Sequence, residues 1–326
     1  MVAVDLFCGC GGLSLGLIKA NINVVAAMDN WKPAIDVYRA NFKHPVLMVD
    51  LSQIDSSIAQ INKYLPDLIA GGPPCQDFSS AGKRNENGDK ADLTLSFSEI
   101  VVGVSPQWFL MENVDRINKS NKYKQAKEQF KRAGYGLTEM VIDASLCNVP
   151  QKRKRMFLIG KLNEQDNFLK PYLLASLSTQ SMTVKEYLGN ELNTEYYYRH
   201  ARSYNRRAIF SIDESSATIR GVNRPIPPKY KLHPGDATTN LEKVRPLTTQ
   251  ERALIQTFPK NFQWPLINKS IQEQLIGNAV PVNLGRYVGQ ILLAYHNDLE
   301  KYMVREDYDL VSPGWDTSSK RMEIIA

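Results

Sequence analysis

The stretch VAVDLFCGCGGLSLGL, residues 2–17, joins an apolar strand pattern to a helix pattern through a glycine-rich turn. Residues 2–7 predict a buried strand, and residues 13–21 predict the helix that follows it. Glycines let the backbone turn tightly and approach a ligand at the start of a helix. The stretch therefore predicts the first βα unit of an open sheet, with a ligand site at the carboxyl end of its strand.

The same rhythm continues to about residue 160. Further strands are predicted at 23–28, 46–49, 67–72, 108–113 and 155–160, and further helices at 32–42 and 122–133. Near-continuous apolar strands that alternate with helices are typical of a doubly wound parallel sheet. We therefore expect an α/β fold with a Rossmann-like domain.

A polar, basic and proline-dotted segment follows, and it predicts a second, smaller domain made mostly of β-strands and loops. Residues 199–245 hold ten lysines and arginines against four acidic residues, an excess equal to the net charge of +6 of the whole chain. This charge is either a solvated surface or a contact for a polyanion, and the arginines, tyrosines and asparagines there favour nucleic acid.

Composition narrows the class of protein. The chain has 326 residues, 43% of them apolar and 23% charged, as in soluble globular proteins. No run approaches the roughly 18 apolar residues of a membrane span, and the N-terminus does not resemble a signal peptide, so we expect a cytoplasmic protein. The four cysteines and four histidines have no zinc-site spacing, and no metal is expected.

Two acidic residues follow predicted strands where a cofactor would bind. Asp29 and Asp50 end the second and third strands, where a carboxylate can accept hydrogen bonds from a ribose. The glycine turn suits NAD, FAD and S-adenosylmethionine alike, although its G-x-G-G spacing differs from the dinucleotide pattern G-x-G-x-x-G. An ordinary tight turn beside helix-capping acids is the alternative.

A cysteine follows two prolines in GGPPCQDFSS, residues 71–80. The prolines stiffen the turn after a strand and hold Cys75 toward the same crevice, as a nucleophile or as a packed side chain. Glu112 ends another apolar strand, and a buried carboxylate is costly unless it is paired or functional. Arg153 and Arg155 share one side of the strand that begins in QKRKRMFLIG.

These motifs, in this order, resemble the DNA cytosine-C5 methyltransferase family of bacterial restriction–modification systems. DLFCGCGGLSLG is similar to its first motif, GGPPCQDFS to its nucleophile motif and ENV to its acid motif, while QKRKRMFLIG and GNAVPVNLG are similar to its late motifs. The resemblance covers roughly residues 1–160 and 245–295. It implies a catalytic domain of residues 1–172 and 278–300, a target-recognition domain of 173–245, a hinge of 246–277 and a peripheral tail of 301–326.

The resemblance also implies a mechanism. Cys75 attacks C6 of a flipped-out cytosine, the methyl group passes from S-adenosylmethionine to C5, and proton loss and thiol release follow. Glu112 would hold and protonate N3, which needs a raised pKa, while Arg155 and Arg153 would fix O2 and nearby groups.

Binding residues are implied in the same way. The cofactor set is Phe7, Gly9, Gly11, Gly12, Asp29, Asn30, Asp50, Leu51, Pro74, Asn278 and Ala279. The substrate and DNA set is Gln76, Ser79, Lys83, Arg84, Thr218, Arg220, Arg224, Lys229 and Lys231. Residues 79–94 match a mobile loop that closes over the base. The implied partner is double-stranded DNA, bound by a monomer whose host also holds a restriction endonuclease in many systems.

The chain departs from the family in three places. Residues 250–254 read QERAL instead of R-E-C-A-R, and residues 89–92 read DKAD where Asp-x-Arg-Gly is common. Position 30 is asparagine where the family commonly has an aromatic residue, and Trp31 lies one position later. Two alternatives stay open. The same chemistry acts on transfer RNA in one branch of the family, and a catalytically silent relative or an unrelated nucleotide oxidoreductase is the other reading.

Overall fold

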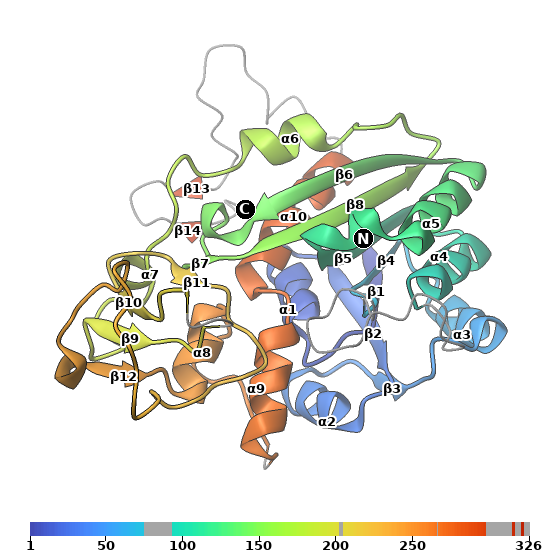
Figure 1. Ribbon diagram of the computed structural model, residues 1–326. Coiled ribbons are helices and arrows are strands. Elements are labelled where there is room, and N and C mark those ends of the chain that lie inside the picture. The colour runs from blue at the N-terminus through green and yellow to red at the C-terminus, as the bar shows by residue number, and fades with distance from the viewer. Residues whose placement is uncertain (75–92, 202–204, 266, 298–314, 317–320, 323–326) are drawn as a thin grey trace.

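The computed structural model describes residues 1–74, 93–201, 205–265, 267–297, 315–316 and 321–322. Its centre is a seven-stranded sheet with the order β3-β2-β1-β4-β5-β8-β6 (Figure 1). The strands are β1 (Val2–Leu6), β2 (Asn23–Asp29), β3 (Val46–Met48), β4 (Leu68–Gly71), β5 (Trp108–Val114), β6 (Tyr135–Asp143) and β8 (Lys154–Leu162). The predicted α/β class is confirmed.

The expectation of a doubly wound parallel sheet holds for five strands but not for β8. The five strands from β1 to β5 pair in parallel, but β8 runs antiparallel to both β5 and β6. A parallel partner needs a long crossover, usually helical. Only the 3-10 turn η3 (Ala144–Leu146) and the short strand β7 (Gln151–Lys152) lie between β6 and β8, so β8 returns in the opposite direction.

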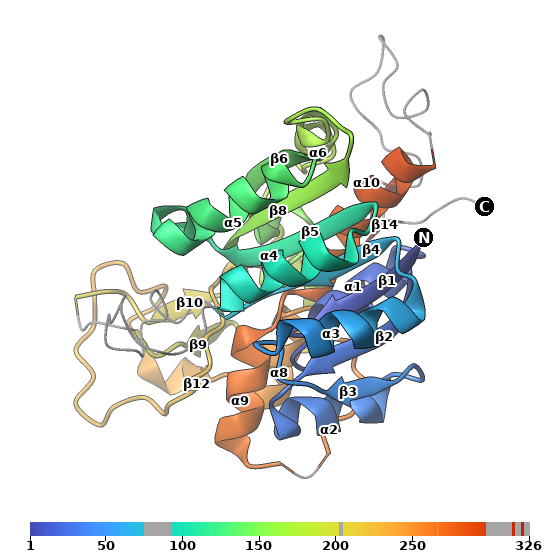
Figure 2. The ribbon, with the colours of Figure 1, turned by 90° about the vertical axis from the view of Figure 1, so that its right-hand side faces the viewer.

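Helices cover both faces of the sheet (Figure 2). One face packs against α1 (Gly12–Lys19), α6 (Lys170–Ala175) and α10 (Val282–His296), and the other against α3 (Ile54–Ile61), α4 (Leu93–Val104) and α5 (Asn121–Arg132). The neighbours Trp108 and Phe109 point to opposite faces and lie in separate hydrophobic clusters. The remaining helix of this part, α2 (Lys32–Asn41), packs beside β2 and β3.

A smaller unit holds the three-stranded sheet β10-β9-β12. Its elements are α7 (Val184–Leu188), β9 (Tyr196–Tyr198), β10 (Ile209–Ser211), β11 (Ser216–Ala217), η4 (Leu241–Lys243) and β12 (Val244–Pro246). Strand β11 pairs with β7, which joins this unit to the main sheet. The helices α8 (Thr249–Ile255) and α9 (Lys269–Asn278) follow, and the expected boundary after residue 172 falls inside α6.

Several elements were not predicted from the sequence, namely β6, α3 and α4. The expected loop of residues 79–94 ends earlier than predicted, because Leu93 and Thr94 already belong to α4, and its other residues lie outside the described ranges. The short elements η1 (Asn62–Tyr64), η2 (Asp115–Lys119), β13 (Trp315–Asp316) and β14 (Arg321–Met322) complete the fold. Within the described ranges, no helix is long and apolar enough to cross a bilayer.

Candidate active site

The glycine-rich turn after β1 adopts backbone angles that favour glycine. Phe7, Gly9 and Gly11 have φ values of 55°, 54° and 91°, all in the left-handed region. Gly12 begins α1, and a Cβ atom there would lie 2.3 Å from the carbonyl oxygen of Val280. The turn therefore lies directly against the segment that follows α9.

Asp29 is bound by the glycine turn. Its Oδ2 accepts a hydrogen bond from the Gly9 amide at 2.9 Å, and its Oδ1 accepts one from the Trp31 amide at 2.8 Å. Burial raises the pKa of this carboxyl group, against the lowering effect of these amides. Asp50 is exposed after β3, and hydrogen bonds from the Ser52 hydroxyl and amide lower its pKa.

The other predicted cofactor residues flank these groups in the chain. Asn30 is exposed directly after β2, and Leu51 is buried next to Asp50. Pro74 is exposed at the end of the first described range. Asn278 is the exposed last residue of α9, and the half-buried Ala279 precedes Val280, which lies against Gly12. The glycine turn and the 278–280 segment are thus brought together.

The acidic residue of β5 is paired. The Nε atom of Arg155 lies 2.9 Å from Oε1 of Glu112, and the two side chains are only 15% and 10% exposed. Burial raises the pKa of Glu112, while the charges of Arg155 and Arg153 oppose the rise. Glu112 is therefore largely shielded from solvent, and it holds a proton more readily than an exposed glutamate does.

The segment that leads to Cys75 packs against this carboxylate. A Cβ atom at Gly72 would lie 3.2 Å from Oε2 of Glu112, and the side-chain amide of Asn113 donates to the Pro73 carbonyl at 2.8 Å. Cys75, Gln76, Ser79, Lys83 and Arg84 lie outside the described residues. The structure therefore fixes the approach to the cysteine and not its thiol.

Arg153 is fully buried, unlike its neighbour Arg155. It lies between β7 and β8 and donates to the carbonyls of Ile219 at 2.9 Å, Gly277 at 2.9 Å and Ala279 at 3.0 Å. Its guanidinium group thus binds backbone from two distant segments.

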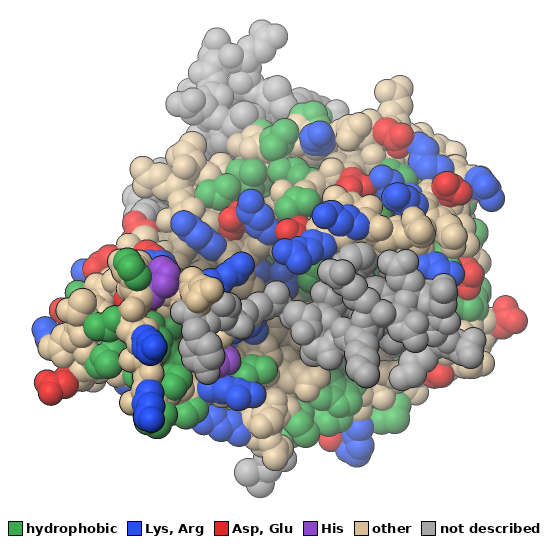
Figure 3. All heavy atoms as spheres, viewed as in Figure 1, with side chains coloured by type: hydrophobic (Ala, Val, Ile, Leu, Met, Phe, Trp, Pro, Cys, Tyr) green, Lys and Arg blue, Asp and Glu red, His purple; other side chains and the backbone are tan. Residues whose placement is uncertain are grey.

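The predicted DNA-binding residues that the structure describes lie in the smaller unit. Arg224, Lys229 and Lys231 are exposed, whereas Thr218 donates to the Lys152 carbonyl at 2.9 Å and Arg220 donates to the His200 carbonyl. Figure 3, viewed from the same side as Figure 1, shows several lysine and arginine side chains on this face of the molecule.

A buried polar chain beneath the glycine turn was missed from the sequence. Ser14 donates to Asp5, and the Tyr38 hydroxyl lies 2.7 Å from both Ser14 Oγ and His44 Nε2. Burial raises the pKa of Asp5 to about 7. The only signal in the sequence was an aspartate within an apolar strand.

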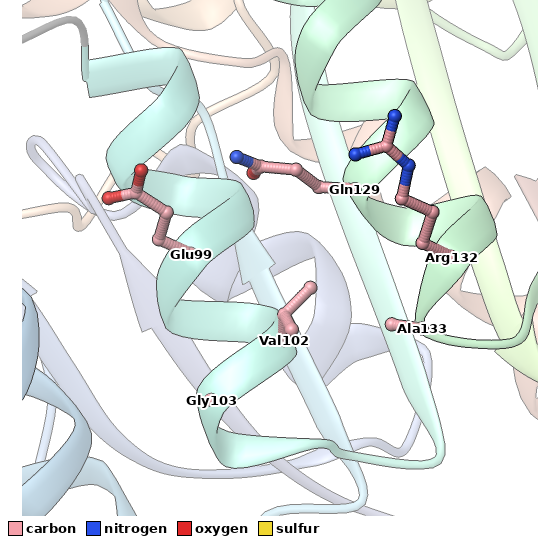
Figure 4. A pocket seen from close by; sticks show the side chains of 6 residues that line it. All are labelled: Glu99, Val102, Gly103, Gln129, Arg132 and Ala133. Atoms are coloured by element: carbon pink, nitrogen blue, oxygen red, sulfur yellow. The ribbon is translucent and has the colours of Figure 1, made fainter.

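A pocket of about 460 Å³ lies between α4 and α5 (Figure 4). It is lined by Glu99, Val102, Gly103, Gln129, Arg132 and Ala133, none of which was predicted as a site residue. In the part of the chain that the structure describes, no three His, Cys, Asp or Glu residues come together as a metal site.

The chain matches a known protein family over most of its length. The family described as C-5 cytosine-specific DNA methylase matches residues 1–293. The chain belongs to this family. It is therefore a DNA cytosine-C5 methyltransferase, and the expectation drawn from the motifs is confirmed.

Individual relatives agree with the family. The chain is 54% identical to the Type II methyltransferase M.HindV of Haemophilus influenzae, over 91% of this chain and 98% of the relative. It is 53% identical to the Type II methyltransferase M.HgiDI of Herpetosiphon aurantiacus, over 91% and 96%. The fold is shared with the Dnmt2 methyltransferase of S. pombe, with a TM-score of 0.67 at 18% identity, over 91% of this chain and 99% of that one.

Proposed function

We propose that this enzyme methylates cytosine in a specific sequence of duplex DNA, with S-adenosylmethionine as methyl donor and Cys75 as nucleophile. The observation that carries the proposal is the buried pair of Glu112 and Arg155, packed against the Gly72–Pro73 approach to Cys75. A buried carboxyl group with a raised pKa, beside a motif cysteine, suits protonation of a pyrimidine nitrogen.

The residues at the strand ends fit the donor. The turn at Gly9, Gly11 and Gly12 brings backbone close to the crevice, and Asp29 and Asp50 offer carboxylates for hydroxyl and amino groups. Phe7, Asn30, Leu51, Pro74, Asn278 and Ala279 would complete the pocket. When bound, S-adenosylmethionine supplies an electrophilic methyl group on a sulfonium centre.

The side chains supply the remaining chemistry. The Cys75 thiolate adds to C6, and the electron pair of the C5–C6 double bond becomes available at C5. Glu112 donates its proton to N3 and so neutralises the charge that develops on the ring, while Arg155 orients Glu112 and faces O2. After methylation, the C5 proton passes to solvent and the thiolate departs, which restores the aromatic ring. N3 then returns its proton to the Glu112 carboxylate.

Recognition of DNA is assigned to residues 173–245, with residues 246–277 as a hinge and 301–326 as a peripheral tail. Arg220, Arg224, Lys229 and Lys231 supply candidate contacts to bases and phosphates, and Gln76, Ser79, Lys83 and Arg84 supply contacts near the flipped base. A cytosine within a duplex must leave the base stack to reach Cys75, at a cost of a few kcal/mol.

The two relatives from Haemophilus influenzae and Herpetosiphon aurantiacus bear the name Type II methyltransferase. We infer that this chain likewise protects host DNA against a companion restriction endonuclease, acts in the cytoplasm on the nucleoid and works as a monomer, since its task is asymmetric. No direct contact with the endonuclease is required.

The test compares duplex DNA with transfer RNA as acceptor of labelled methyl groups from S-adenosylmethionine. We expect transfer to DNA, at one sequence mapped by bisulfite sequencing, and a covalent adduct between Cys75 and a duplex that contains 5-fluorocytosine. The variant Cys75→Ser should lose both, whereas Cys147→Ala, at a cysteine buried in the core, should keep both. Methylation of RNA alone, or an adduct at another residue, would contradict the proposal.

A further inference from the structure

Residues 218–223, here called the recognition strap, are held by three arginines. The Thr218 carbonyl accepts from Arg199, the Ile219 carbonyl from Arg153 and the Arg220 carbonyl from Arg252. Three consecutive carbonyls of an irregular segment are thus each bound by a different charged side chain. Bonds from charged donors are stronger than neutral ones, so the strap's position is fixed from three sides.

Arg252 is the least expected of the three. Its Nε lies 2.5 Å from Oε2 of Glu273, and both side chains are 4% exposed. It stands at one of the positions where residues 250–254 depart from the family pattern. A buried arginine without a counter-ion is costly, so Glu273 makes its burial possible.

Glu273 also binds the far end of the strap. Its Oε1 accepts from the Asn223 side-chain amide at 3.0 Å and from the Thr249 hydroxyl at 2.8 Å. The same amide of Asn223 donates to the Leu247 carbonyl at 2.8 Å. The ion pair therefore ties the strap to both α8 and α9.

The strap also lies against the segment that borders the cofactor site. A Cβ atom at Gly277 would lie 2.1 Å from the Gly221 amide nitrogen, so the two backbones touch. Arg153 joins the Ile219 carbonyl to those of Gly277 and Ala279. A shift of the strap must therefore be accommodated at the edge of the active site.

We propose that Arg252, paired with Glu273, is a positioning residue for target recognition, which holds the strap so that Arg220 and the adjoining Arg224 meet the DNA in register with the catalytic pocket. The inference rests on the proposed function, because it takes residues 173–245 as the recognition domain. Arginine suits this task because its forked head pairs with a carboxylate through Nε while Nη2 donates to a carbonyl. Lysine carries its donors on a single nitrogen, which cannot lie at both the Nε and the Nη2 positions of Arg252.

The experiment first maps the methylated sequence of the wild-type enzyme by bisulfite sequencing. It then measures kcat and KM on duplexes that carry this sequence or a single-base change. The variants are Arg252→Lys, Asn223→Ala and the double variant Arg252→Met with Glu273→Met, which removes both charges of the pair together. The control is Lys127→Met, since Lys127 of α5 pairs with Glu139 of β6, outside residues 173–245 and away from the strap.

We expect the KM for the mapped duplex to rise roughly tenfold in Arg252→Lys and in the double variant, with a loss of discrimination against the changed duplex. The control variant should keep the wild-type KM and the wild-type discrimination. Arg252→Lys retains a cation for Glu273, so a purely stabilising pair would leave its KM and discrimination unchanged, and that result would overturn the inference.

If the double variant fails to fold, Arg252→Lys and Asn223→Ala still decide between the two outcomes. A wild-type enzyme that methylates no duplex DNA refutes the proposed function itself. A wild-type enzyme that methylates DNA, with variants that retain its KM and discrimination, refutes only the role of Arg252.

Discussion

Arg155 and Glu112 lie on neighbouring antiparallel strands, and their side chains meet diagonally across the pair. Arg155 is in register with Val114, two residues beyond Glu112, so both side chains are on the same face of the sheet. Because β8 runs antiparallel to β5, its first residues lie beside the last residues of β5, which brings Arg155 next to Glu112. The pair is thus a product of the fold. Burial raises the pKa of this carboxyl group next to the approach to Cys75, and the charge of Arg155 opposes the rise.

Glu112→Gln should reduce kcat by about 10²–10⁴-fold, since a positioned acid contributes that much and glutamine has no proton to transfer. The substitution keeps the shape of the side chain but leaves Arg155 without its counter-ion, so the unfolding temperature should fall, and kcat is measured at a temperature where the variant is folded. Single-turnover rates on duplex DNA give the measurement. A variant with wild-type kcat would show that Glu112 is not the acid.

Arg155→Met should move the pH dependence of the remaining activity. Burial raises the pKa of Glu112, and the charge of Arg155 is the largest influence that lowers it. Activity that needs protonated Glu112 falls as the pH rises through this pKa. Removal of Arg155 raises the pKa further, so the falling limb of the kcat profile should move to higher pH. The exposed Arg132→Met serves as the control, and a limb that moves to lower pH would contradict the assignment.

The sequence placed the residues at strand ends correctly, because apolar runs and glycine turns are local patterns. Asp29 and Glu112 were therefore found where the structure has them, at the carboxyl-terminal ends of β2 and β5. Strand β6 was missed, because its sequence YGLTEMVID mixes polar with apolar residues and has no clear period. The direction of β8 depends on its partners in space, which no local pattern encodes.

The pairing of side chains that are far apart in the chain could not be predicted from the sequence either. The contact between Arg252 and Glu273 spans 21 residues, and that of Arg153 with Ala279 spans 126. Residue types show that a buried charge needs a partner, but not which partner the fold supplies. For this reason Arg153 was predicted as a contact to the base, whereas the structure shows it bound to backbone carbonyls.

Gly12→Ala should weaken binding of S-adenosylmethionine more than it alters the rest of the molecule. The new Cβ would lie 2.3 Å from the Val280 carbonyl oxygen, so the 278–280 segment must move away from the glycine turn. Gly134→Ala is the matched control, since its φ of +87° costs roughly 1–2 kcal/mol, but nothing lies within 4 Å of the new atom. Calorimetric titration should show weaker cofactor binding only for Gly12→Ala. Equal affinities of the two variants for S-adenosylmethionine would show that Gly12 is not part of the cofactor site.

Titration of Asp5 should lower the free energy of unfolding as the pH rises from about 4 to about 7. Burial is the main cause of its raised pKa, about 7 in the folded protein against 3.8 in the unfolded chain. The folded state therefore holds this proton more tightly, and the free energy of unfolding falls by at most about 1.4 kcal/mol per pH unit across that window. Above the pKa of the folded protein Asp5 is ionised in both states, so it no longer makes the free energy of unfolding depend on pH.

Asp5→Asn removes this titration while the side-chain oxygen can still accept the Ser14 hydrogen bond. Urea unfolding at several pH values between 5 and 8 should give a smaller decrease in stability for the variant than for the wild type. The slopes are compared, because the new amide also changes the absolute stability. Asp55→Asn is the control, since Asp55 is exposed in the first turn of α3, whereas the buried chain of Asp5, Ser14 and Tyr38 joins β1, α1 and α2. If the Asp5→Asn variant and the wild type lose stability in parallel over this range, Asp5 is already ionised in the folded protein.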